Sequence, residues 1–273
     1  MLEFIKAILF GIVEGITEWL PVSSTGHMIL LNEFLHLDVS AAFWEMFLVV
    51  IQLGAILAVV ILHWNRLVPL SLKGGFHWNN QTLIMWVKIL ISCVPAAIVG
   101  LIWDDELNSL FYNYQTVAVM LILFGVIFII LEKRNKHRLP TCNSIEQITF
   151  RAAIWIGLFQ LIAAVFPGTS RSGATIIGAL MIGISRGTAA EYTFFLAVPV
   201  MLGASLLKLV QFGFSFARFE IALLACGMLS AFIVSIIAIS FLIRFVKKHD
   251  FQVFGWYRIV LGIGVMLYFL LTQ

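Results

Sequence analysis

The stretch that decides the fold is Glu14-Gly15-Ile16-Thr17-Glu18-Trp19-Leu20-Pro21-Val22-Ser23-Ser24-Thr25-Gly26-His27. It places two carboxylates, several hydroxyls and a histidine inside an otherwise apolar run. Ionisable groups within a membrane cost roughly 2–4 kcal/mol each on insertion scales, and they are by default candidates for a functional site. Proline and glycine also interrupt a helix, so the stretch predicts a helix that breaks within its polar cluster.

The whole chain is strongly apolar. It has 273 residues, of which 62% are hydrophobic and 11% are charged, and its mean hydropathy is +1.04. Because soluble domains carry about 25% charged residues, the composition predicts a polytopic, all-α membrane protein. The basic residues gather in a few loops, which indicates a topology signal rather than nucleic-acid binding. The three cysteines have no spacing that suggests a disulfide framework or a metal centre.

Six apolar stretches are long enough to cross a bilayer, which takes about 20 residues each. They fall at about 43–64, 83–103, 115–131, 190–211, 221–243 and 253–272. Two further apolar regions, 2–37 and 150–185, are broken, the first at Pro21 to Gly26 and the second at Pro167 to Gly173. Each of these regions predicts a pair of shorter helices.

The two broken regions resemble each other. Pro21 aligns with Pro167 at an offset of 146 positions. The same offset pairs Glu14 with Gln160 and Ser24 with Ser170. Broken helices at corresponding positions of two halves are typical of repeat-built membrane folds and mark their binding sites.

We therefore predict a single membrane domain over residues 1–273, built as an inverted-topology repeat. The halves lie at about 1–132 and 150–273, and a basic cytoplasmic loop at 133–149 joins them. Each half consists of a re-entrant broken helix pair followed by three transmembrane helices.

The charged loops predict the orientation. Basic residues gather in three loops, marked by Arg66 and Lys73, by 133–151 and by 244–248, whereas the loops at 104–106 and 212–219 hold only Arg218. The positive-inside rule places the first three loops in the cytoplasm and the last two outside. The first broken pair then enters from outside and the second from inside, so their breaks meet near the midplane. The helices that restart there offer N–H groups to an anion.

The first break supplies acids and hydroxyls. Glu14 and Glu18 share one helix face, where they could hold a divalent cation or orient a base, although a solvated helix end is the alternative. Ser24 followed by His27 is typical of a nucleophile and its base. The hydroxyls of Ser23, Ser24 and Thr25 could instead cap the restarting helix.

The second break, Pro167-Gly168-Thr169-Ser170-Arg171-Ser172-Gly173-Ala174-Thr175, supplies an anion clamp. The planar guanidinium of Arg171 suits bidentate recognition of phosphate, and neighbouring hydroxyls complete the cradle. Gln52 is a weaker candidate, because packing between helices explains it equally well. Elsewhere, Lys88, Lys208 and Arg258 are predicted to reach the membrane surface near span ends, and Arg186 to pair with Glu191.

Both motifs, together with Val50-Ile51-Gln52-Leu53-Gly54 and the six spans, strongly resemble the bacterial undecaprenyl-pyrophosphate phosphatase family, also called the bacitracin-resistance protein family. The resemblance covers essentially the whole chain. It implies hydrolysis of the membrane lipid undecaprenyl pyrophosphate to the monophosphate carrier for peptidoglycan synthesis, and resistance to bacitracin. It also implies a divalent cation and action at the outer side of the bacterial cytoplasmic membrane.

The resulting hypothesis assigns catalysis to Ser24, His27, Glu18, Glu14 and Arg171. Substrate binding is assigned to Arg171, Ser170, Ser172, Thr175, Ser23, Thr25 and Gln52. Glu14 and Glu18 hold the cation, Mg²⁺ or Ca²⁺. Either Ser24 attacks the distal phosphorus with His27 as base or proton donor, or His27 attacks and Ser24 binds phosphate.

The rival class is a secondary transporter or lipid flippase, because inverted repeats with broken helices are the transporter pattern. A non-catalytic lipid-binding protein leaves the co-occurrence of acids, serine, histidine and arginine unexplained. No nucleic-acid partner is expected, and a homodimer is left open.

Overall fold

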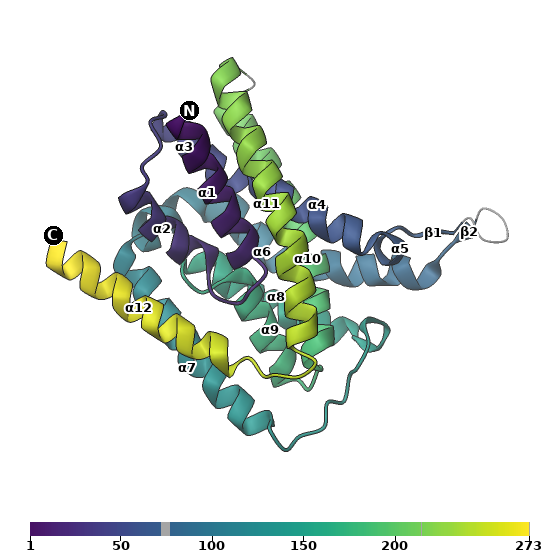
Figure 1. Cartoon of the computed structure of the whole chain (residues 1–273). Helices are drawn as coiled ribbons and strands as arrows, with labels where there is room; N and C mark the ends of the chain where they lie inside the picture. Colours follow the sequence, from purple (N-terminus) through teal and green to yellow (C-terminus); the bar gives the residue numbers. More distant parts are fainter. Residues whose placement is uncertain (72–76, 214, 273) are drawn as a thin grey trace.

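The computed structural model describes residues 1–71, 77–213 and 215–272 (Figure 1). Lys73, used above for the orientation, lies outside the described residues. The regular elements of the described chain are helices and one antiparallel strand pair, β1 (Leu70–Ser71) and β2 (His77–Trp78).

Six helical segments of the described chain are long and apolar enough to cross a membrane, so the protein is an integral, multi-pass membrane protein. They are Ala41–Leu62, Asn80–Trp103, Tyr114–Asn135, Arg186–Phe212, Arg218–Phe245 and Gln252–Thr272. Each coincides with a predicted span, which confirms that part of the sequence analysis.

The elements of these spans follow the chain in order. The first span is α3 (Ala41–Val50) and α4 (Gln52–Leu62), separated at Ile51. The others are α6 (Asn80–Phe111), which departs from helical geometry at Trp103, α7 (Tyr114–Asn135), α10 (Arg186–Phe212), α11 (Arg218–Phe245) and α12 (Gln252–Thr272). Two short pieces, α5 (Trp64–Leu67) and the 3₁₀ turn η1 (Ile145–Gln147), lie in connections.

The two broken regions form helix pairs of matching length. The first members, α1 (Leu2–Thr17) and α8 (Phe150–Val165), have 16 residues each. The second members, α2 (Ser24–Phe34) and α9 (Arg171–Met181), have 11 residues each. Within each pair the two helices pack against each other, so each pair is a hairpin. We call the connections at 18–23 and 166–170 the first and the second tip.

Each tip ends in a serine with the same unusual backbone. Ser23 (φ 72°, ψ 100°) and Ser170 (φ 69°, ψ 119°) are the non-glycine residues with positive φ in the described chain. Each side-chain oxygen accepts from the backbone N–H three residues on, that of Gly26 or Gly173, and so caps the following helix. The offset of 146 is therefore wrong at the tips. The second tip has one more residue after its proline, and Ser24 stands opposite Arg171 rather than opposite Ser170.

The hairpins are embedded among the spans through close glycine contacts. α1 packs against α11, and α8 packs against α6. A Cβ on Gly15 would come within 2.7 Å of the Ala231 carbonyl, and one on Gly157 within 2.6 Å of the Ser92 carbonyl. Larger residues at these positions would push the hairpins outward, so the glycines allow the tips to lie deep in the molecule.

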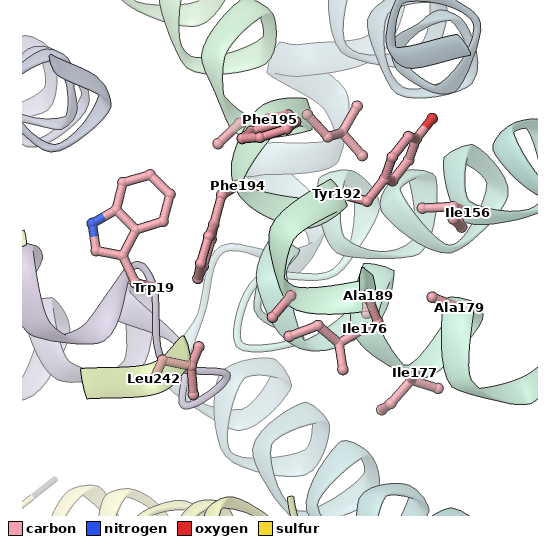
Figure 2. Close-up of a cluster of buried hydrophobic side chains, with 14 of the residues drawn as sticks. Trp19, Ile156, Ile176, Ile177, Ala179, Ala189, Tyr192, Phe194, Phe195 and Leu242 are labelled. Atoms are coloured by element: carbon pink, nitrogen blue, oxygen red, sulfur yellow. The ribbon is translucent and has the colours of Figure 1, made fainter. Parts of the chain in front are cut away.

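α7 and α12 run side by side, and the two ends of the described chain lie on one side of the molecule, away from the connection that follows α7 (Figure 1). At the crossing of these helices a Cβ on Gly125 would meet the Gly255 carbonyl at 2.7 Å, and the reverse contact would be 2.8 Å. The largest buried cluster lies around α9 and α10. Figure 2 shows that Trp19 of the first tip faces Phe194 of α10, with an edge-on ring contact of 5.4 Å between centroids. The tips thus lie in apolar surroundings.

Candidate active site

The two tips are joined by an ion pair. Glu18 Oε1 accepts from Arg171 Nη2 at 2.9 Å, and both side chains are largely buried. A second contact runs from Ser172 Oγ to the Leu20 carbonyl at 3.4 Å. The sequence-based expectation that the two breaks meet is confirmed.

The other oxygen of Glu18 binds Ser24. Ser24 Oγ donates to Glu18 Oε2 at 3.0 Å, so one carboxylate holds the candidate nucleophile and the candidate phosphate-binding arginine together. Because a hydroxyl needs a base within hydrogen-bond reach to become a nucleophile, the carboxylate of Glu18 has the position of that base. In the described chain Ser24 and His27 share no hydrogen bond, because Ser24 turns to Glu18 and His27 turns to the Ser23 carbonyl and Tyr257. The assignment of His27 as the base of Ser24 stays a prediction.

His27 is held by two other groups. Its Nδ1 lies 2.7 Å from the Ser23 carbonyl, and its Nε2 lies 2.7 Å from the Tyr257 hydroxyl. A carbonyl only accepts, so Nδ1 carries the proton, and Nε2 accepts from Tyr257 when the ring is neutral and donates to it when the ring is protonated. Sequence reasoning missed Tyr257, because an aromatic residue in a span gives no signal of a polar partner.

Glu14 lies beside this network with unused hydrogen-bonding capacity. It is buried, it interacts with Glu18 and with Arg171, and its Oε1 has no hydrogen-bond partner. Two carboxylates therefore stand next to one guanidinium, and their hard oxygen atoms fit a divalent cation. The described residues contain no cluster of three or more His, Cys, Asp or Glu that could hold a metal. Phosphate or water oxygens would have to complete such a site.

Arg171 is positioned from α10. Its Nη1 donates to the Thr193 carbonyl at 3.1 Å, and its buried Nε has no partner. Thr175 Oγ1 lies 2.9 Å from both the Arg171 carbonyl and Thr193 Oγ1, which ties the start of α9 to α10. Thr193 was missed by sequence reasoning, because a threonine inside an apolar span resembles ordinary helix packing.

Of the remaining predicted site residues, some lie within the cluster and others do not contact it. Ser170 Oγ lies 3.1 Å from Ser172 Oγ, within the second half of the site. Ser23 and Ser170 act as helix caps, as the capping alternative expected for the first of them. Thr25 and Gln52 are half-buried, and no hydrogen bond within the described part of the chain joins their side chains to the cluster.

Arg186, Glu191 and Lys88, which lie outside the tips, have partners other than those predicted. Arg186 donates to the buried Glu132, which also accepts from the Phe251 N–H. Glu191 pairs with Arg66 instead of with Arg186. Lys88 is buried and donates to the Glu146 carbonyl at 3.1 Å.

Arg258 departs furthest from its prediction. It does not reach the membrane surface, because its side chain is fully buried between the two tips. An ionisable residue inside a predicted span indicates a functional or structural role in the interior. The same pattern is also typical of an arginine that extends to the membrane surface, which is how Arg258 was interpreted from the sequence.

A groove of about 810 Å³ opens between α3, α6, α8 and α10. Small residues make much of its wall: Ala96, Ala97, Gly100, Ala164, Gly203 and Ala204. Glu45, Tyr112 and Lys208 lie in its lining near one end of these helices. Ala164, which also lines the groove, lies in the last turn of α8, two residues before the second tip, so the groove runs beside that hairpin.

These features define a class: a polytopic helical membrane protein with a buried acid, hydroxyl and guanidinium site between two broken helix hairpins. A sequence profile of the bacitracin resistance protein BacA family matches residues 7–264. The chain is 63% identical to undecaprenyl-diphosphatase 1 of Clostridium acetobutylicum over 99% of both chains. It is 62% identical to the undecaprenyl-diphosphatase of Desulfitobacterium hafniense over 98% of this chain and 97% of the relative. The same enzyme of Acetivibrio thermocellus is 57% identical over the full length of both. The chain belongs to the bacitracin resistance protein family.

Proposed function

We propose that the chain hydrolyses undecaprenyl pyrophosphate to undecaprenyl phosphate and inorganic phosphate, which recycles the lipid carrier for peptidoglycan synthesis and confers bacitracin resistance. Relatives named undecaprenyl-diphosphatase, 57–63% identical over nearly the whole chain, support this assignment. The observation that carries it is the pair of contacts from Glu18, one to Ser24 and one to Arg171. A transporter needs no hydroxyl placed on a base.

In the proposed reaction, Ser24 Oγ attacks the distal phosphorus and its proton passes to Glu18. The bond from that phosphorus to the bridging oxygen breaks, and undecaprenyl phosphate leaves. Water then hydrolyses the phosphoserine and releases phosphate. Arg171, whose Nε has no partner, neutralises charge on the transferred group, which is the main part of phosphoryl-transfer catalysis.

Other residues of the site are assigned roles beside this reaction. Glu14 and Glu18 would hold the divalent cation, Mg²⁺ or Ca²⁺, which supplies positive charge to the pyrophosphate when bound. His27 orders the start of α2 and is the alternative nucleophile, with Ser24 as a phosphate ligand. Ser170, Ser172 and Thr175 shape the anion cradle, and Thr25 and Gln52 contact the substrate only if it extends beyond the cluster.

The polyprenyl tail is assigned to the groove between α3, α6, α8 and α10. Its lining is mainly apolar and includes Ala164, which lies two residues before the second tip. A lipid that enters it would therefore place its pyrophosphate at the tips while its tail stays in the groove and the adjoining bilayer.

In this proposal the two halves of the chain form an inverted-topology repeat, and the protein lies in the bacterial inner membrane. The equal lengths of the paired helices, the matching caps at Ser23 and Ser170 and the exchanged packing of α1 on α11 and α8 on α6 support it. The basic loops favour an active site that opens to the outer, periplasmic side.

Phosphate release from purified protein in detergent tests the function, because no second compartment exists for transport. We expect release from undecaprenyl pyrophosphate, its loss with a chelator, and a large decrease in Arg171→Ala and His27→Ala. The exposed Arg244→Ala is the matched control and keeps wild-type turnover. Wild-type protein that binds the lipid and releases no phosphate would refute the proposal.

Trapping the intermediate identifies the nucleophile. An acid-stable phosphoserine supports Ser24, whereas an acid-labile phosphohistidine supports His27.

A further inference from the structure

The guanidinium of Arg258 lies between the two tips. Its Nη1 donates to the Pro21 carbonyl of the first tip at 3.2 Å. Its Nη2 donates to the carbonyls of Gly168 and Thr169 in the second tip, at 2.9 and 2.7 Å. One planar group thus contacts both tips at once.

The environment of Arg258 is unusual for a charge. The side chain is fully buried, and its hydrogen-bond partners in the described chain are backbone carbonyls, with no carboxylate among them. A buried charge without an ion pair is costly unless hydrogen bonds satisfy it, and a broken helix leaves carbonyls that equally need donors. The arginine and the tips therefore satisfy each other.

The carbonyls held by Arg258 are close in sequence to the reactive groups. Pro21 lies three residues from both Glu18 and Ser24, and Thr169 lies two residues before Arg171. The guanidinium also packs tightly on the second hairpin, since a Cβ on Gly173 would come within 2.9 Å of Nη1. Moving Arg258 would move the tips relative to each other.

We propose that Arg258 is a positioning residue that sets the spacing of the two tips, and with it the register of Ser24 and Glu18 against Arg171. This inference rests on the proposed phosphatase function, but the distance between the two tips can be measured without any turnover. Arg258 directs its donors at carbonyls of the tips, whereas Arg171 carries the free donor that can bind phosphate.

The first test is a comparison of Arg258→Lys with wild type in phosphate release. Lysine keeps the charge but has one nitrogen and cannot reach both tips in this geometry. Since a displacement of about 1 Å can cost roughly 100-fold in rate, we expect kcat to fall about 10- to 100-fold while KM changes less than about threefold. Wild-type kcat, or a KM that rises as steeply as in Arg171→Lys, overturns the proposal.

A double-mutant cycle separates positioning from general stability. If Arg258 acts by placing Arg171, the loss caused by Arg258→Lys largely disappears in an Arg171→Ala background. If the double variant loses activity by the product of the two single-variant factors, Arg258 and Arg171 act independently, and the proposal is overturned. Should Arg258→Lys not fold, Gly173→Ala, which crowds the same guanidinium, is judged by the same criteria.

A measurement without turnover distinguishes this inference from the function itself. In a chain with Cys93, Cys142 and Cys226 replaced by alanine, Leu20→Cys and Ser172→Cys place a thiol pair across the tips, where Ser172 Oγ lies 3.4 Å from the Leu20 carbonyl. We expect copper-phenanthroline to form the disulfide readily when Arg258 is present and several-fold more slowly in the Arg258→Lys background. Equal rates overturn the positioning role even if the enzyme is active. Inactive wild-type protein with the expected difference in rates refutes only the phosphatase assignment.

Discussion

Glu18 and Arg171 lie 153 positions apart in the sequence and are joined by an ion pair of 2.9 Å between Oε1 and Nη2. The same carboxylate accepts from Ser24 through its other oxygen. A change at any one of these residues therefore alters the surroundings of the other two.

Replacing Ser24 with alanine removes the proposed nucleophile and frees one oxygen of Glu18. We expect turnover to fall about 10³-fold or more, which is the usual size of the loss when a nucleophile that works together with a base is removed. Phosphate release from purified protein measures it. Ser109→Ala, at an exposed serine whose hydroxyl donates to the Glu106 carbonyl of its own helix, is the control and keeps wild-type turnover. Near-full activity of Ser24→Ala would exclude Ser24 as nucleophile.

Replacing Glu14 with glutamine removes a charge from the proposed cation site and changes little volume. We expect the Mg²⁺ or Ca²⁺ concentration for half-maximal activity to rise about 10-fold, in line with the usual cost of weakening a metal site. A cation titration of phosphate release checks this, with the exposed Glu33→Gln as control. An unchanged titration curve would place the cation elsewhere.

Replacing Gly203 with leucine partly fills the groove. The position has open space for a Cβ, so the folded state tolerates the change. We expect KM for undecaprenyl pyrophosphate to rise about 10-fold, because the leucine occupies volume that the tail needs, while hydrolysis of farnesyl pyrophosphate stays nearly constant. Gly264→Leu is matched, since it is equally unobstructed but lies on α12 outside the groove. Equal effects on both substrates would contradict the assignment of the tail.

Replacing Glu132 with glutamine weakens a buried contact far from the tips. This carboxylate accepts from Arg186 and from the Phe251 N–H, and it links α7, α10 and the start of α12. We expect a loss of about 2 kcal/mol in stability, because the partly exposed Arg186 loses its ion pair and the buried Phe251 N–H loses a charged acceptor. A chain of this size then shows a Tm about 4–8 °C lower. Thermal unfolding in detergent measures this Tm, with Glu33→Gln as the reference variant. The kcat of Glu132→Gln at low temperature is expected to equal that of the wild type.

The spans and the helix breaks could be predicted from the sequence because their signals are local. An apolar run of about 20 residues and a proline beside glycines each specify a structure without reference to the rest of the chain. The sequence also singled out Glu18, Ser24 and Arg171 as candidates, because polar groups are rare in such a chain, and the structure brings these three side chains into contact.

The partners of these residues could not be predicted in the same way. Which oxygen of Glu18 meets Ser24, and why His27 turns to Tyr257, depend on side-chain directions at two helix ends. The two capping serines, Ser23 and Ser170, lie 147 positions apart rather than 146, which an alignment on prolines does not detect. Arg258 donates to backbone carbonyls, and Thr193 accepts through its own. Such contacts cannot be predicted from the sequence, because every residue has a carbonyl.

Arg258 also places a condition on the order of assembly. It lies on α12, which the ribosome synthesises after every other described element, while its partners at Pro21, Gly168 and Thr169 belong to hairpins inserted much earlier. Until α12 is in place, both tips lack their common donor. A chain interrupted before this helix would hold every residue assigned to the chemistry and still lack the clamp that aligns them, so biosynthesis itself delays activity until the membrane domain is finished.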